Sequence, residues 1–109
     1  MNIRVDNFFA GLPASSEQEQ FLTLFKSESV KIERIVSHSH SSPPGFWYDQ
    51  PENEWVMVLR GHAVLELASG ELVRMKEGDH VLIPNRSKHR IVQTGPETIW
   101  LAVRAKKAL

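Results

Sequence analysis

The chain has 109 residues, 13 basic and 13 acidic side chains that give a formal net charge of zero, and no cysteine. This length fits one domain, and the lack of cysteine excludes disulfides, thiolate metal sites and a cysteine nucleophile. The balanced charge argues against nucleic-acid binding, and no apolar run is long enough to span a membrane. The first residues lack the pattern of a secretory signal, so we expect a cytoplasmic protein with neither nucleic-acid nor membrane partners.

Residues 1–20 differ from the rest of the chain and are expected to form a short N-terminal arm. The segment Asn7–Pro13 is apolar and is interrupted by turn-forming residues. We expect this arm to pack on the body of the domain, or on a partner subunit, through Phe8, Phe9 and Leu12.

From residue 21 onward, apolar and polar residues alternate over short segments that are separated by turn-forming residues. A period of two is typical of β-strands, and no long helical period is present. The segments expected to be strands are 21–25, 30–36, 46–50, 54–59, 63–67, 72–75, 78–84, 89–92 and 98–103, with a polar tail at 104–107. Many short strands with frequent turns predict one all-β domain over residues 21–109, either a sandwich or a small barrel.

Two separated motifs place a carboxylate and an imidazole at matching strand positions. Glu54 begins an apolar strand that leads to a turn at Gly61, and His89 follows Gly78 and Pro84, where another strand ends. A histidine just past a strand end can point into the mouth of a β-barrel, where small ligands bind. Glutamate and histidine in such a place can form a metal site or an acid–base pair.

The spacing within these two motifs resembles that of the cupin superfamily. Glu54 and Gly61 match the end of the first cupin motif, and Gly78, Pro84 and His89 match the second. The resemblance implies a single antiparallel cupin β-barrel, which is also described as a double-stranded β-helix or jelly roll. It also implies a homodimer.

Further segments narrow the resemblance to small single-domain bacterial cupins of unknown function. Such proteins carry stretches similar to residues 42–50 and 100–103 of this chain. The resemblance as a whole covers residues 30–103.

Two features depart from the cupin pattern. The second motif usually has a glycine two residues after its proline, where this chain has Arg86. Metal-binding cupins usually carry a His-x-His pair shortly before the glutamate, and the corresponding residues here are Tyr48 and Gln50. A His-x-His pair does occur at His38 and His40, but it lies much earlier, in a loop rich in serine and proline.

The resemblance and these departures define a set of candidate metal ligands, namely Gln50, Glu54, His89, Tyr48, His40 and His38. One glutamate and one histidine hold a divalent ion weakly, because ions such as Zn²⁺ require three or four protein ligands. If amide and phenol oxygens complete the set of ligands, the site favours Mn²⁺ or Fe²⁺. If a loop histidine completes it, the site suits Zn²⁺, Ni²⁺ or Fe²⁺. The expected cofactor is therefore a divalent metal whose identity stays open.

Aromatic and basic side chains near the two motifs are candidates for a ligand pocket, namely Trp47, Trp55, Arg90 and Trp100. The aromatic rings can stack on a planar ligand or belong to the core. Arg90 can bind an anionic group of a ligand or lie solvated at a strand end.

The sequence leaves three kinds of function open. The first is a metal-dependent enzyme that acts on a small molecule, for example an oxygenase or isomerase, in which Gln50, Glu54 and His89 hold the ion. The second is a non-catalytic cupin that binds or senses a small organic ligand, and the third is an interaction protein. No P-loop, dinucleotide fingerprint or nucleophile elbow points to other chemistry.

Overall fold

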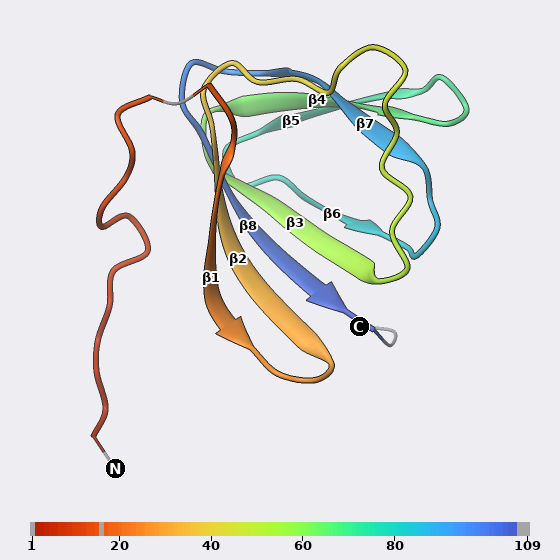
Figure 1. The fold of residues 1–109 in the computed structure, drawn as a ribbon. Helices are drawn as coiled ribbons and strands as arrows, with labels where there is room; N and C mark the ends of the chain where they lie inside the picture. The colour runs from red at the N-terminus through yellow and green to blue at the C-terminus, as the bar shows by residue number, and fades with distance from the viewer. Residues whose placement is uncertain (1, 16, 107–109) are drawn as a thin grey trace.

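The computed structural model describes residues 2–15 and 17–106 of the chain. These residues form eight β-strands and no helix, so the all-β prediction is confirmed (Figure 1). In chain order the strands are β1 (Gln20–Lys26), β2 (Val30–Ser37), β3 (Asn53–Arg60), β4 (His62–Leu67), β5 (Leu72–Lys76), β6 (His80–Ile83), β7 (His89–Thr94) and β8 (Thr98–Ala105). Within the described ranges there is no helix that is long and apolar enough to cross a membrane.

The strands form two antiparallel sheets. The larger sheet has the order β1-β2-β8-β3-β6, and the smaller sheet has the order β5-β4-β7. Figure 1 shows the smaller sheet above the larger one, with the two sheets splayed apart on the side of β6 and β7. No strand ladder between the described residues joins one sheet to the other, so the predicted barrel is an open two-sheet sandwich rather than a hydrogen-bonded closed cylinder.

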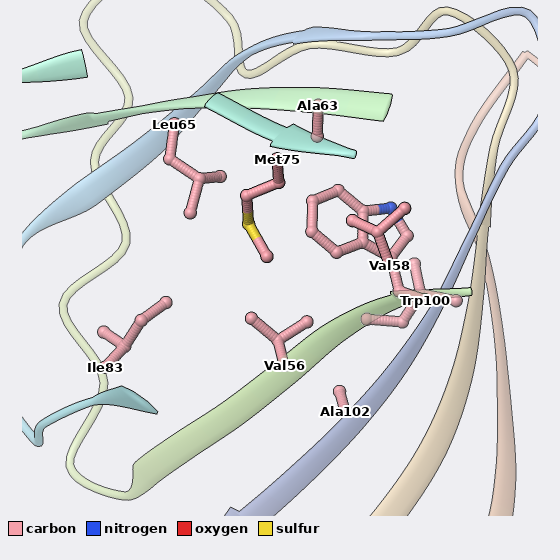
Figure 2. Close-up of a cluster of buried hydrophobic side chains, with 9 residues drawn as sticks. Val56, Val58, Ala63, Leu65, Met75, Ile83, Trp100 and Ala102 are labelled. Atoms are coloured by element: carbon pink, nitrogen blue, oxygen red, sulfur yellow. The ribbon is translucent and has the colours of Figure 1, made fainter. Parts of the chain in front are cut away.

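The core lies between the two sheets and follows from the alternation of residues along each strand. On β3, Val56 and Val58 are buried, whereas the intervening residues are less buried. Figure 2 shows the core side chains that meet between the sheets, namely Val56, Val58, Ala63, Leu65, Met75, Ile83, Trp100 and Ala102. Full burial of one such aliphatic side chain stabilises the fold by roughly 2 kcal/mol.

One predicted strand is absent, and two predicted boundaries are wrong. The strand predicted at residues 78–84 is shorter, because residue 78 lies in a turn and β6 spans only His80–Ile83. Residues 46–50 do not form a strand and make only an isolated bridge between Tyr48 and His89. Proline residues flank this segment on both sides, and proline cannot donate a backbone hydrogen bond to a ladder. The predicted polar tail at 104–107 is also wrong for Arg104 and Ala105, which continue β8, and residue 107 lies outside the described residues.

The N-terminal arm contacts its own domain, which is one of the two predicted arrangements. The buried Arg34 of β2 donates hydrogen bonds to the carbonyl oxygens of Phe8, at 2.9 Å, and Ala10, at 2.7 Å. The Arg60 guanidinium lies 5.0 Å from the centre of the Phe9 ring. Ile35, which follows Arg34 on the strand, lines the cavity between the sheets, so Arg34 and residues 8–10 of the arm lie on the outer face of the larger sheet.

Candidate functional site

A cavity of about 220 Å³ lies between the two sheets at one end of the core. Its polar side chains are Glu19, Tyr48, Gln50, Glu54, His89 and Arg104. The other side chains that line it are apolar and come from both sheets. An apolar cavity with a few convergent polar groups is the usual form of a small-molecule site.

Glu54 of β3 and His89 of β7 face each other across the gap between the sheets. Both side chains are buried, and Glu54 Oε1 lies 3.9 Å from His89 Nε2. His89 Nδ1 lies 2.9 Å from the Ser87 carbonyl oxygen, which can only accept, so Nδ1 carries a proton. In the neutral imidazole the lone pair is therefore on Nε2, the atom that faces the glutamate.

Tyr48 packs against the imidazole and fixes its plane. The rings of Tyr48 and His89 stack with their centres 5.3 Å apart, and the two residues exchange backbone hydrogen bonds of 2.7 and 3.1 Å. Burial raises the pKa of the Tyr48 phenol, and the carboxylates of Glu19 and Glu54 raise it further, against the opposing effect of Arg104. The phenol is therefore protonated at neutral pH and can act as a hydrogen-bond donor.

Arg104 belongs to the site, although the sequence predicts a polar tail at this position. It lies directly opposite Glu54 in the register of β8 and β3, and its Nε donates to Glu54 Oε2 at 3.0 Å. Its Nη1 lies 3.1 Å from Oε1 of the buried Glu33. Burial lowers the pKa of Arg104, but the carboxylates of Glu54 and Glu33 outweigh burial and raise it overall. The guanidinium therefore stays charged between two carboxylates.

Glu19 is a second cavity residue that the sequence does not predict. The Ser37 hydroxyl donates a hydrogen bond to the Glu19 carboxylate, and Trp100 Nε1 lies 3.2 Å from the same hydroxyl oxygen. This chain of contacts ties the carboxylate to the cavity wall. The sequence carries no signal for this role, because Glu19 precedes the first alternating segment.

Four of the six predicted metal ligands line the cavity, but His38 and His40 do not. His40 Nδ1 accepts a hydrogen bond of 2.7 Å from the backbone N–H of His38, and the His40 carbonyl accepts one of 2.6 Å from the Thr94 hydroxyl. These bonds hold the loop beside the end of β7, at the opposite end of that strand from His89.

Only one of the four predicted pocket residues, Trp100, lines the cavity, and the other three do not: Trp47, Trp55 and Arg90. Trp55 and Arg90 directly follow Glu54 and His89 on their strands, and consecutive strand residues point to opposite faces. Trp55 lies against His80 with ring centres 5.3 Å apart, and the Arg90 guanidinium lies 5.9 Å from the centre of the Trp47 ring.

The donor set does not fit a metal centre with three protein ligands. Within residues 2–15 and 17–106 there is no group of three or more histidine, cysteine, aspartate or glutamate side chains that could hold an ion. Glu54 Oε2 is already bonded to Arg104, whose positive charge opposes a second cation nearby. The raised pKa of Tyr48 also makes its phenolate an unfavourable ligand. The metal therefore stays a prediction from the sequence.

A family comparison identifies the class of protein. The family model described as the cupin domain matches residues 31–103, which is more than half of the chain, so the protein belongs to the cupin family. This finding confirms the family that the two sequence motifs indicate.

Solved structures agree with the family. A protein from Ralstonia eutropha JMP134, named a "putative mannose-6-phosphate isomerase", is 39% identical, with a TM-score of 0.91 over 96% of this chain and 100% of that one. A cupin superfamily protein from Desulfitobacterium hafniense is 16% identical, with a TM-score of 0.75 over 88% of this chain and 84% of that one.

An RmlC-like cupin from Methanocaldococcus jannaschii, described as having a double-stranded β-helix fold, is 20% identical, with a TM-score of 0.71 over 96% of this chain and 92% of that one. The two more distant similarities show the fold alone. No curated protein matches the chain.

Proposed function

We propose that this cupin binds a small organic molecule in the cavity and transfers a proton to or from it through Glu54 and His89. The observation that carries this proposal is the buried pair itself, with Glu54 Oε1 3.9 Å from His89 Nε2 at the polar end of a largely apolar cavity. Buried titratable groups that converge in a concave site are typical of acid–base catalysis.

The geometry favours His89 as the base. Its Nδ1 proton is held by the Ser87 carbonyl, which leaves Nε2 free to take a proton from a carbon next to a carbonyl group. The electrons of the broken C–H bond move to the carbonyl oxygen, and the protonated Tyr48 phenol can donate a hydrogen bond to that oxygen. The Glu54 carboxylate stabilises the imidazolium. In an α-hydroxy carbonyl substrate the intermediate is an enediolate, whose remaining hydroxyl proton moves to the former carbonyl oxygen. Return of the imidazolium proton to the former carbonyl carbon then completes an isomerisation.

The name of the Ralstonia eutropha protein supports the class of reaction, because interconversion of an aldose and a ketose can proceed by this kind of proton transfer. The name does not by itself carry the substrate over to the present chain. The metal-dependent oxygenase or isomerase that the sequence predicts is the competing account.

Hydrogen exchange of a ketone tests the proton transfer. We expect the wild-type chain to accelerate exchange of the methylene protons of 2-hydroxyacetophenone in D₂O, followed by proton NMR. The rate above background should fall by roughly 100-fold in His89→Asn, because the base is lost. His80→Asn is the matched control, since His80 is an exposed histidine of β6, and it should keep the wild-type rate. Equal rates for wild type and His89→Asn would contradict the proposal.

Elemental analysis separates this proposal from the metal-dependent one. We expect a metal-to-chain ratio near zero for protein purified without chelator, and exchange that EDTA does not change. A ratio near one, together with loss of exchange in EDTA, would instead support the metal-dependent enzyme.

We also propose that two copies associate through β1. This strand is at an edge of the larger sheet, and all seven of its residues are exposed. Its large apolar side chains are between 44% and 54% exposed, namely Phe21, Leu22, Leu24 and Phe25. An exposed apolar edge favours pairing with a second copy, because antiparallel pairing of identical strands satisfies both edges symmetrically.

Light scattering tests this association. Wild type should have the mass of a dimer, and Leu24→Lys should have the mass of a monomer, because it places a charge at the centre of the pairing. Leu72→Lys is the matched control, since Leu72 is a 48% exposed leucine on the edge strand β5. A monomeric wild type would contradict the proposal.

A further inference from the structure

We infer that the cavity takes an uncharged or cationic, largely apolar molecule of about one ring and rejects carboxylates and phosphates. This inference rests on the proposed function and specifies its ligand. It also separates the substrate of this chain from the sugar phosphate in the name of the Ralstonia eutropha protein.

The arginine that lines the cavity already pairs with two carboxylates. Among the described residues, Arg104 is the only lysine or arginine that lines the cavity. Its Nε is bonded to Glu54 at 3.0 Å, and its Nη1 lies 3.1 Å from Glu33, whose side chain is only 2% exposed. An incoming anion would have to draw the guanidinium away from two buried carboxylates, which would leave Glu54 without its arginine and Glu33 paired to Lys31 instead.

Carboxylates exceed cations around the polar end. Glu19 and Glu54 line the cavity, and Glu33 lies directly behind Arg104. Two cations lie near these three carboxylates, namely Arg104 and Lys31. Lys31 pairs with Glu33 at 3.2 Å. The excess negative charge repels an anionic ligand, and the low dielectric of a largely apolar cavity strengthens this repulsion.

The basic residues that flank His89 in the sequence do not form an anion site. Arg90 is bonded to Glu66 at 3.3 Å and to a loop carbonyl at 3.1 Å, outside the cavity. Arg86 is bonded to the backbone oxygen of Asp49 at 3.2 Å and lies 3.6 Å from its carboxylate. Lys88 is exposed and does not line the cavity. None of these three basic residues lines the cavity, so none of them offers a charged donor to a phosphate there.

The walls favour an apolar ligand. Seven of the thirteen residues that line the cavity are apolar, and a sugar hydroxyl that faces them would lack a hydrogen-bond partner. An apolar protein cavity of about 150 Å³ holds benzene, so the volume of about 220 Å³ here suits one ring with a short polar substituent.

Probes that share one ring and differ in charge test the inference. By isothermal titration calorimetry at neutral pH, we expect benzyl alcohol and benzylammonium to bind with dissociation constants on the order of 1 mM. Benzoate and mannose 6-phosphate should bind at least about tenfold more weakly. If benzoate binds as tightly as benzyl alcohol, the inference is overturned and the proposed function stays intact. No binding by any probe would overturn both.

A charge-removing variant assigns the selectivity to the cavity. Glu54→Gln should tighten benzoate about tenfold and weaken benzylammonium about tenfold, because it frees part of Arg104 and removes one carboxylate. Glu66→Gln is the matched control, since Glu66 is paired to an arginine outside the cavity, and it should change neither value. Unchanged selectivity in a folded Glu54→Gln variant would contradict the inference, and if this variant does not fold, the wild-type probe series decides alone.

Discussion

Two arginine–glutamate pairs in this molecule have the same chemistry but face opposite ways. Arg104 lies directly opposite Glu54 across β8 and β3, and Arg90 lies directly opposite Glu66 across β7 and β4. The shortest contacts in the two pairs are 3.0 and 3.3 Å. The first pair faces the cavity and the second faces away from it, so the face of the strand decides which pair shapes the binding site.

The surroundings of the two pairs differ in burial and in the number of partners. In the inner pair the Glu54 side chain is buried, with 8% of it exposed. Arg104 also contacts a second buried carboxylate, that of Glu33. The Glu66 side chain of the outer pair is 29% exposed, and Arg90 instead bonds to carbonyl oxygens of the loop at Ser42 and Pro43. The inner pair therefore sets the charge of the cavity, whereas the outer pair holds a loop in place.

The largest expected effect is on stability. Arg104→Met should lower the free energy of unfolding by about 3 kcal/mol, because it leaves the buried Glu54 without its arginine and removes one of the cations beside the buried Glu33. Arg90→Met should lower it by only about 1 kcal/mol, since its partner is more exposed. Urea unfolding at neutral pH, followed by circular dichroism, measures both. A smaller loss for Arg104→Met than for Arg90→Met would contradict the comparison.

The titration of Tyr48 sharpens the comparison, because Tyr48 is the only tyrosine in the chain. Its raised folded-state pKa should place the phenolate absorbance midpoint at 295 nm above 10.0. Arg104→Met should move this midpoint further up, because Arg104 opposes the shift, whereas Arg90→Met should leave it unchanged. A wild-type midpoint at or below 10.0 would contradict this account of the site.

The same pKa shift makes stability depend on pH. The folded-state pKa of Tyr48 lies above its unfolded value of 10.0, so its contribution to stability is complete below pH 10 and is lost as the pH rises through the folded-state pKa. Tyr48→Phe should therefore lose stability less steeply than wild type above pH 10, as measured by urea unfolding. Equal slopes of stability against pH in the two proteins would show that the pKa of Tyr48 does not change on unfolding.

The smallest expected effect on stability concerns a third arginine, Arg86, in the loop between β6 and β7. Arg86 has a backbone φ of 59°, in the left-handed region that favours glycine, and glycine is the residue that the cupin motif usually has here. Arg86→Gly should be more stable than Arg86→Ala by about 1 kcal/mol, because only glycine relieves the backbone strain. Thermal unfolding of the two variants measures the difference, and a less stable Arg86→Gly would contradict the assigned strain.

The sequence predicts the meeting of Glu54 and His89, because motif spacing specifies which strand ends carry them. It does not predict Arg104, because a charged residue near the end of the chain resembles a solvated tail. Alternation from Trp100 through Ala102 on β8 would have placed Arg104 on the inner face. Alternation would likewise have removed Trp55 from the candidate pocket, because it directly follows Glu54.

Other predictions need information that a single chain does not carry. The register between β3 and β8, which brings Glu54 and Arg104 together, depends on contacts between distant segments. The metal, the homodimer, the cytoplasmic location and the boundary of the arm at residue 20 stay predictions.

Ring-nitrogen NMR of ¹⁵N-histidine-labelled protein tests the central claim most directly, with benzyl alcohol as the titrated ligand. The chain has five histidines, and His89 is the one that lines the cavity among the described residues. We expect the Nε2 resonance of His89 to shift on titration, while its Nδ1 stays protonated and the other four histidines do not change. An unchanged His89, or shifts confined to the other histidines, would show that this pair does not form the polar end of a small-molecule site.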